Sequence, residues 1–120
     1  MAGELYELSA TNLIALYQAK KASPVEAAQS VLKRIDTLQS TYNAFCVIDP
    51  EHTLHAARES ENRWSKGQTA GLVDGIPTTI KDLMLSKGWP TLRGSKTVNQ
   101  SSRAKTKKTP HFYKNFAKIS

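Results

Sequence analysis

A short stretch near the middle of the chain, residues 74–82 with the sequence DGIPTTIKD, places a lysine and an aspartate at the end of a predicted β-strand. An Asp-Gly turn signal opens the stretch, and Pro77 is tolerated only near the start of a strand or on an edge. The β-branched residues that follow favour extended backbone, so a strand is predicted from Ile76 to Lys81. The residue of this strand that could do chemistry is Lys81.

Two interpretations of Lys81 follow from its position. The ammonium group can leave the sheet and stay in water, which is the more common outcome for a lysine. Alternatively, the side chain can stay in a partly buried pocket. Desolvation there disfavours the charged form of a lysine and leaves an amine that can take a proton from a hydroxyl group.

The loop after this strand carries a second motif, Gly88-Trp89-Pro90-Thr91-Leu92-Arg93-Gly94-Ser95. A Gly-Ile-Pro strand that ends in Lys-Asp, followed by a loop with Pro-Thr and Gly-Ser, resembles the amidase signature family. The resemblance runs from about Leu5 to Val98. It implies a hydrolase of carboxylic amides, of α/β type, in which Lys81 is the catalytic base. It also implies that Asp82 orients the loop or pairs with a nearby group rather than performing chemistry. Gly94 and Ser95 are expected to shape the loop beside the site, with Ser95 as a hydrogen-bonding residue.

The same resemblance implies two serines, a relay serine held in a cis peptide and a second serine that attacks the amide carbonyl, with backbone amides stabilising the oxyanion. In the family both serines lie well downstream, in glycine-serine-rich motifs. The sequence has no glycine after Gly94, and Ser101-Ser102 lacks flanking glycines, so neither serine is assigned. A truncated or frame-shifted chain would explain this pattern. We therefore expect the 120 residues to be inactive alone.

Three helices and about two short strands are predicted to position these residues. Ser9 can cap a helix over residues 10–21, and Ser23, Pro24 and Glu26 form a capping box that starts a helix over residues 24–39. A turn follows over residues 40–43. Another strand is predicted over residues 44–48, and an amphipathic helix over residues 50–65. The buried face of the second helix is expected to hold Val25, Ala28, Leu32, Ile35 and Leu38.

The formal net charge of +7 is concentrated at the end of the chain. Residues 1–95 hold ten Lys and Arg and ten Asp and Glu, whereas residues 96–120 hold no acidic residue. The chain is therefore divided into an N-terminal part of an amidase-signature domain, residues 1–98, and a divergent basic tail, residues 99–120, that we expect to be poorly ordered. The tail leaves an alternative open: a non-catalytic fragment or small basic module that binds acidic partners or RNA. A basic tail without a recognised motif is, however, more often solvated.

No metal or cofactor is predicted. His52 and His55 could share a helix face, and His111 is the third histidine, but no His-Glu-x-x-His arrangement is present and helical histidines on a polar face are usually plain surface. The glycine spacings fit neither nucleotide fingerprint. The expected partner is a small-molecule amide, not a membrane or a nucleic acid, and no oligomeric state is predicted. Without a leader pattern or an apolar run of membrane length, a cytoplasmic location is expected.

Overall fold

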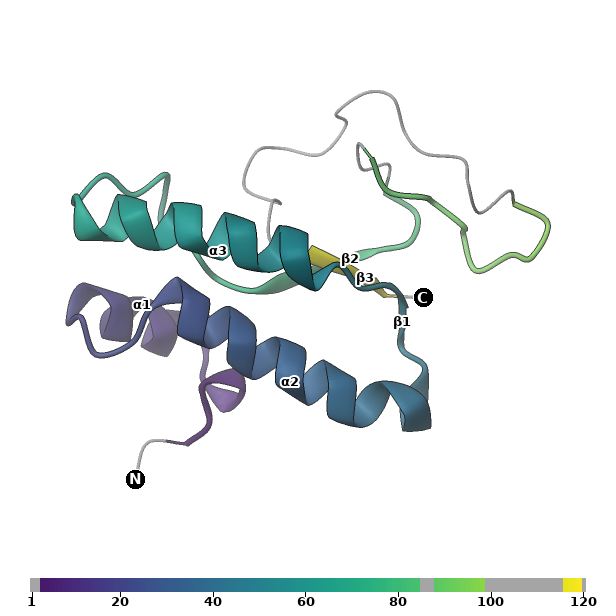
Figure 1. Ribbon diagram of the computed structural model, residues 1–120, viewed down its shortest axis with the longest axis horizontal. Helices are drawn as coiled ribbons and strands as arrows, with labels where there is room; N and C mark the ends of the chain where they lie inside the picture. The colour runs from purple at the N-terminus through teal and green to yellow at the C-terminus, as the bar shows by residue number, and fades with distance from the viewer. Residues whose placement is uncertain (1–2, 85–87, 99–115, 120) are drawn as a thin grey trace.

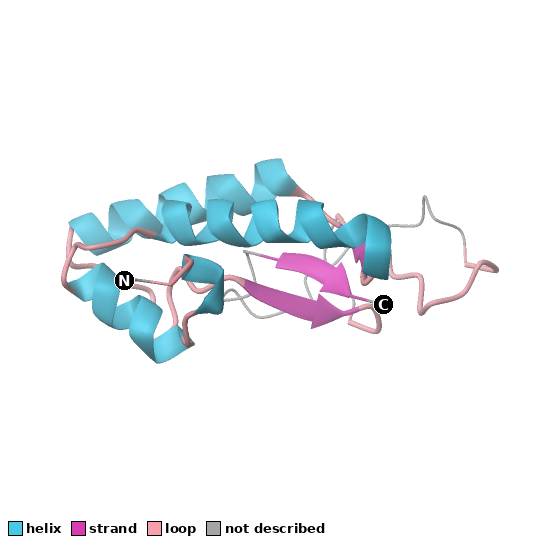
Figure 2. Ribbon diagram, turned by 90° about the horizontal axis from the view of Figure 1, so that it is seen from below, coloured by secondary structure: helices cyan, strands magenta, loops and turns pink. Residues whose placement is uncertain are grey.

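Three α-helices and a small sheet give the chain an α/β architecture, in which helices α2 and α3 lie side by side along the molecule (Figure 1). The computed structural model describes residues 3–84 and 88–98, together with the backbone of residues 116–119. In the side view the two long helices, α2 and α3, lie over the strands (Figure 2). The predicted fold class and its three helices are confirmed.

A short 3-10 helix, Leu5–Glu7, precedes helix α1, which spans Ala10–Gln18. Ser9 caps α1 as predicted and accepts a hydrogen bond from the backbone N–H of Asn12. The helix ends earlier than predicted because Lys20 adopts a left-handed conformation, with φ of 56°. The N–H of Lys20 then donates to the carbonyl of Tyr17, and the N–H of Lys21 donates to the carbonyl of Leu16. This termination motif usually has glycine at the left-handed position, so the sequence did not indicate it.

Helix α2 spans Pro24–Tyr42. The predicted capping box is present: Ser23 Oγ accepts from the N–H of Glu26 at 3.3 Å, and the Glu26 carboxylate accepts from the N–H of Ser23 at 2.8 Å. The predicted turn over residues 40–43 is wrong, since residues 40–42 continue the helix. Asn43, with φ of 45°, ends α2 and donates its N–H to the carbonyl of Gln39.

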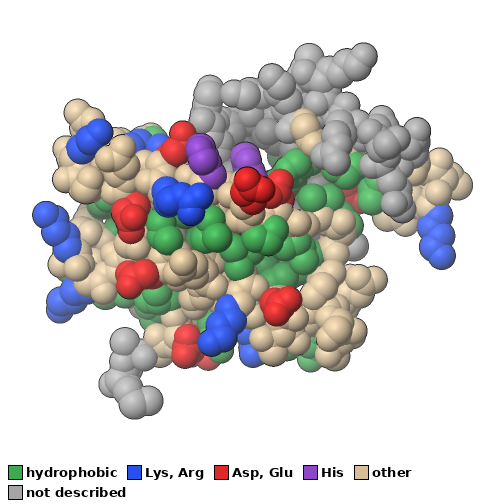
Figure 3. Space-filling model, viewed as in Figure 1, with side chains coloured by type: hydrophobic (Ala, Val, Ile, Leu, Met, Phe, Trp, Pro, Cys, Tyr) green, Lys and Arg blue, Asp and Glu red, His purple; other side chains and the backbone are tan. Residues whose placement is uncertain are grey.

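Helix α3 spans Pro50–Ser65, the range predicted, and Asp49 caps it by accepting from the N–H of His52 at 2.9 Å. Helices α2 and α3 pack against each other, and each buries two alanines, whose small side chains allow close approach between packed elements. The buried alanines are Ala27, Ala28, Ala56 and Ala57. On the face shown in Figure 3, hydrophobic side chains gather along the seam between the two helices.

The predicted buried face of α2 is only partly correct. Ala28 and Ile35 are buried, whereas Val25, Leu32 and Leu38 are half-buried. Ala27 is buried as well, in a core cluster with Leu13 and Tyr17 of α1. The pattern of α2 alone could not show this contact, because it depends on where α1 packs.

The sheet has the strand order β1-β3-β2. Strand β1 is Phe45–Val47, β2 is Thr78–Lys81, and β3 is Phe116–Ile119. Strand β3 pairs antiparallel with β1 and parallel with β2, where Lys81 is opposite Ile119. No strand was predicted over residues 116–119. The rest of the predicted basic tail lies outside the described residues.

Candidate functional site

Lys81 is the last residue of β2. Its neighbour Ile80 is buried at 4% exposure, whereas Lys81 itself is exposed. The alternation of the strand explains this difference, because successive side chains point to opposite faces of a sheet. Of the two interpretations of Lys81, the exposed side chain agrees with the first, in which the lysine is not held in a partly buried pocket.

Asp82 follows at once and is buried, with 2% of its surface exposed. One carboxylate oxygen accepts a hydrogen bond from the N–H of Leu92 at 3.0 Å, and the other accepts from the N–H of Gly94 at 3.4 Å. A buried carboxylate is costly unless donors satisfy it, so these bonds hold the loop against the end of β2. Asp82 thus connects the strand that carries Lys81 to the loop that carries the second motif.

The loop itself turns sharply at Arg93 and Gly94, which have φ of 53° and 66°. Gly94 is exposed and a Cβ there would meet nothing within 4 Å, so backbone conformation rather than crowding explains a glycine at this position. The N–H of Ser95 donates to the carbonyl of Leu92, and its hydroxyl lies 2.7 Å from the Thr97 hydroxyl. The structure therefore brings Gly94 against Asp82, the residue that directly follows Lys81, while the hydroxyl of Ser95 is engaged within the loop.

The turn that precedes β2 is more highly connected than the sequence indicated. Asp74 Oδ1 accepts from Ser60 Oγ at 2.8 Å and from Arg63 Nη2 at 2.6 Å, and Oδ2 accepts from Arg63 Nε at 2.8 Å. The N–H of Ala70 also donates to this carboxylate. The indole N–H of Trp64 donates to the backbone carbonyl of Asp74 at 3.1 Å. Asp74 therefore fastens the turn before β2 to the last turns of α3.

Gly75, the next residue, is where the other two helices meet this turn. Its carbonyl accepts a hydrogen bond from the hydroxyl of Tyr17 on α1 at 3.1 Å, and burial raises the pKa of that hydroxyl. Gly75 is buried with φ of 83°, against Pro24 of α2 and Ser60 of α3. All three helices thus fix the chain before it enters the strand that ends at Lys81. The Asp-Gly pair predicted a turn, but only the packed structure reveals these partners.

The buried carboxylate of Asp74 makes stability depend on acid. Burial alone would raise the pKa of Asp74, but hydrogen bonds from Arg63, the Ala70 amide and Ser60 outweigh it, so the pKa lies below its usual range. A carboxyl group with a lowered folded-state pKa stabilises the fold above its unfolded pKa, and this contribution is lost as the pH falls through the folded value. We therefore expect the free energy of unfolding to decrease as the pH falls below about 4.

Urea unfolding of the wild type and of Asp74→Asn, measured at neutral and acidic pH, checks this expectation. Asp74→Asn should be less stable at neutral pH and should lose less stability on acidification. Asp36→Asn, which removes an exposed carboxylate from α2, is the matched control and should follow the wild type. Equal losses in the wild type and in Asp74→Asn would contradict the assignment.

The histidines considered as metal ligands make other contacts. His52 packs edge-on against Trp89, with ring centroids 5.7 Å apart, and His55 Nδ1 lies 4.0 Å from a carboxylate oxygen of Glu59. Among the residues that the structure describes, no three His, Cys, Asp or Glu side chains are grouped so that they could hold a metal ion. His111 lies outside that part of the chain. In the same part, no helix is both long and apolar enough to cross a membrane.

Comparison with known sequences gives consistent matches. A family model described as Amidase matches residues 26–109. A glutamyl-tRNA(Gln) amidotransferase subunit of Salinispora tropica is 37% identical over 95 residues, and the corresponding protein of Paraburkholderia phytofirmans is 41% identical over 95 residues. In both matches 79% of this chain aligns with 19% of the relative. The chain therefore spans about a fifth of the length of these curated relatives.

Solved structures agree. A bacterial aryl acylamidase of the amidase signature enzymes superposes with a TM-score of 0.74 at 28% identity, over 80% of this chain and 20% of that one. A second structure, of a vestigial protein complex connected with the origins of an s-triazine catabolic enzyme, has a TM-score of 0.79 over 93% of this chain and 25% of that one. Its identity is 18%, so this second likeness concerns the fold alone.

Proposed function

Because the chain belongs to the amidase family, we propose that it forms the N-terminal part of a carboxylic amide hydrolase and supplies the lysine base of its site. Lys81 is the residue that would act as the base. The supporting observation is the arrangement at the end of β2, where the buried carboxylate of Asp82 holds the loop at Leu92 and Gly94 beside the strand that carries Lys81. A base needs a fixed position relative to the proton that it removes, and in this proposal the Asp82 bonds fix the backbone from which Lys81 extends.

In the proposed reaction, the amine of Lys81 takes a proton from a relay serine, which takes one from the serine that attacks the amide carbonyl. The relay then returns a proton to the amine product as the amide C–N bond breaks. Water hydrolyses the resulting acyl-serine ester, which releases the acid and restores the serine. Asp82 and Gly94 are positioning residues in this scheme, since they fix the loop and touch no reacting atom. Ser95 would contribute a hydrogen bond from the same loop. Neither serine of the reaction is assigned to this chain.

A lysine exposed to water is a poor base, and Lys81 is exposed. The proposed site therefore requires further parts of the domain to bury the Lys81 side chain. Hydrophobic side chains beside the motif support the idea that more of the domain packs here. Leu72, which precedes β2 in the sequence, is 92% exposed, and Leu83, which follows it, is 60% exposed. The curated relatives, about four times as long as this chain, have further residues that would bury such side chains. The cytoplasm stays the predicted location.

The first expected result is that the 120-residue chain alone hydrolyses neither aliphatic nor aromatic amides. Catalysis by a lysine base needs a nucleophile within hydrogen-bond reach and backbone donors for the oxyanion. Neither reacting serine, nor a glycine-serine motif that would supply such donors, is assigned in this chain. Release of amine from simple amides, followed with purified protein, checks this. Turnover that disappears when Lys81 is replaced would overturn it.

The second half of the same experiment uses a chimera. Residues 5–98 replace the matching segment of the Paraburkholderia phytofirmans relative, which is 41% identical to this chain over 95 residues. The chimera, combined with the same partner subunits as the parent protein, should retain amide hydrolysis if this segment supplies a functional lysine and loop. A folded chimera without activity would contradict the proposed function.

A further inference from the structure

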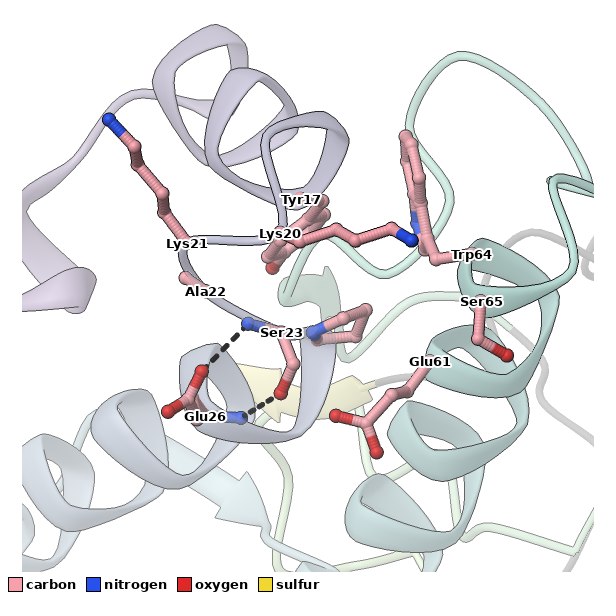
Figure 4. A pocket seen from close by; sticks show the side chains of 10 residues that line it. Tyr17, Lys20, Lys21, Ala22, Ser23, Glu26, Glu61, Trp64 and Ser65 are labelled. Atoms are coloured by element: carbon pink, nitrogen blue, oxygen red, sulfur yellow. Dashed lines mark hydrogen bonds between the residues drawn. The ribbon is translucent and has the colours of Figure 1, made fainter.

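A hollow of about 350 Å³ lies where the connection between α1 and α2 faces the end of α3 (Figure 4). Lys20, Ser23 and Pro24 contribute to one side, and Glu61, Trp64 and Ser65 to the other. The hollow is at the opposite end of the helix pair from the strand ends, where Lys81 lies, so the proposed amidase reaction does not use it (Figure 1). Its volume is in the range of small-molecule sites.

The apolar part of this hollow is held rigidly. The Trp64 indole donates to the carbonyl of Asp74, and its ring packs edge-on against the Tyr17 ring with centroids 5.7 Å apart. Pro24 is fully buried, and the capping box fixes Ser23 beside it. A preorganised aromatic surface costs little ordering entropy when a ligand packs on it.

Two opposite charges flank this surface. The left-handed backbone at Lys20 sends its side chain across the hollow toward Trp64, whereas the Lys21 side chain points away (Figure 4). The Glu61 carboxylate lies on the α3 side of the hollow (Figure 4). Among the described residues, neither Lys20 nor Glu61 takes part in a salt bridge. The Glu26 carboxylate is already engaged by the N–H of Ser23.

We propose that this hollow binds a free α-amino acid with an apolar or aromatic side chain. Lys20 would pair with the ligand carboxylate, Glu61 with its ammonium group, and the side chain would pack on Trp64. Other ligand classes fit less well: Glu61 would repel a phosphate, Lys20 would repel a simple cation, and a hydrocarbon would leave both charges desolvated without a partner. The proposal is independent of amide hydrolysis.

The test uses the 120-residue chain and three related probes: L-phenylalanine, its amide, which lacks the carboxylate, and N-acetylphenylalanine, which lacks the ammonium group. In a Trp89→Phe background, Trp64 is the remaining tryptophan, and its fluorescence reports binding. At a pH of about 6 the amines of phenylalanine and its amide are protonated. L-Phenylalanine should bind saturably with a dissociation constant of roughly 1 mM, and each single-charge probe about three- to fivefold more weakly.

Charge-neutral variants assign each contact. In Lys20→Gln, phenylalanine and its amide should bind equally, and in Glu61→Gln, phenylalanine and N-acetylphenylalanine should bind equally. Lys66→Gln and Glu59→Gln remove exposed charges at α3 that do not line the hollow, and both should keep the wild-type preferences. Circular dichroism checks that every variant is folded.

Three results would overturn the proposal: no saturable fluorescence change with phenylalanine, equal affinity for all three probes in the unaltered site, or unchanged preferences in Lys20→Gln and Glu61→Gln. Amide NMR shifts locate the binding. They should concentrate at residues 20–26 and 61–65, and shifts confined to residues 78–95 would place the ligand at the Lys81 end instead.

Discussion

Replacing Lys81 by alanine in the active chimera is expected to reduce kcat/KM for amide hydrolysis by a factor of about 10³–10⁴. The amine is the proposed proton acceptor, and alanine offers no substitute. Lys81→Arg should be similarly inactive, because the guanidinium group stays protonated under all ordinary conditions. A comparison of kcat/KM for the three proteins, with one amide substrate, measures the effect.

The fold should survive this change. Lys81 is exposed at the end of β2, and its side chain is not part of the buried core. Thermal unfolding of the variant should therefore differ little from that of the unaltered chimera. Lys66→Ala, an exposed lysine at the end of α3, is the matched control for loss of a positive charge and should keep full activity. Near-normal turnover by Lys81→Ala would remove the residue from the proposed role.

Local signals account for most of what the sequence predicted correctly. The capping box of Ser23 and Glu26 involves residues three positions apart, so both partners are visible in the sequence. It placed the start of α2 at the observed residue, and the amphipathic pattern of residues 50–65 placed α3. The end of α1 at Gln18 was missed because it depends on Lys20, and a lysine rarely adopts the left-handed conformation.

The connections around the candidate site depend on contacts that no local pattern contains. The Asp82 carboxylate meets amides ten and twelve positions further along, and the hydroxyl of Tyr17 reaches Gly75 across 58 positions. The Asp-Gly turn was predicted, whereas its role as the meeting point of three helices was not. The partners of Asp74, Ser60 and Arg63, lie on α3 fourteen and eleven positions earlier, so no local pattern identified them.

Gly75→Ala is expected to destabilise the chain by about 3 kcal/mol or more. An added Cβ would lie 2.6 Å from Ser60 Oγ, and 2.7 Å and 2.9 Å from ring carbons of Pro24. Neither neighbour can move easily, because Ser60 Oγ is hydrogen-bonded to Asp74 and Pro24 is fully buried. The φ of 83° adds strain for any residue with a side chain. Urea unfolding, compared with the wild type, measures the loss.

Gly67→Ala separates the two causes. Gly67 also has a positive φ, of 65°, but a Cβ there would meet nothing within 4 Å, so this variant carries conformational strain alone, roughly 1–2 kcal/mol. The difference between the two variants is then the cost of crowding at the meeting point of the three helices. If Gly75→Ala unfolds at the same urea concentration as Gly67→Ala, close packing at this turn is not what fixes the strand that carries Lys81. A larger loss in Gly75→Ala, reduced when Ser60→Gly is added, would assign the crowding to Ser60 directly.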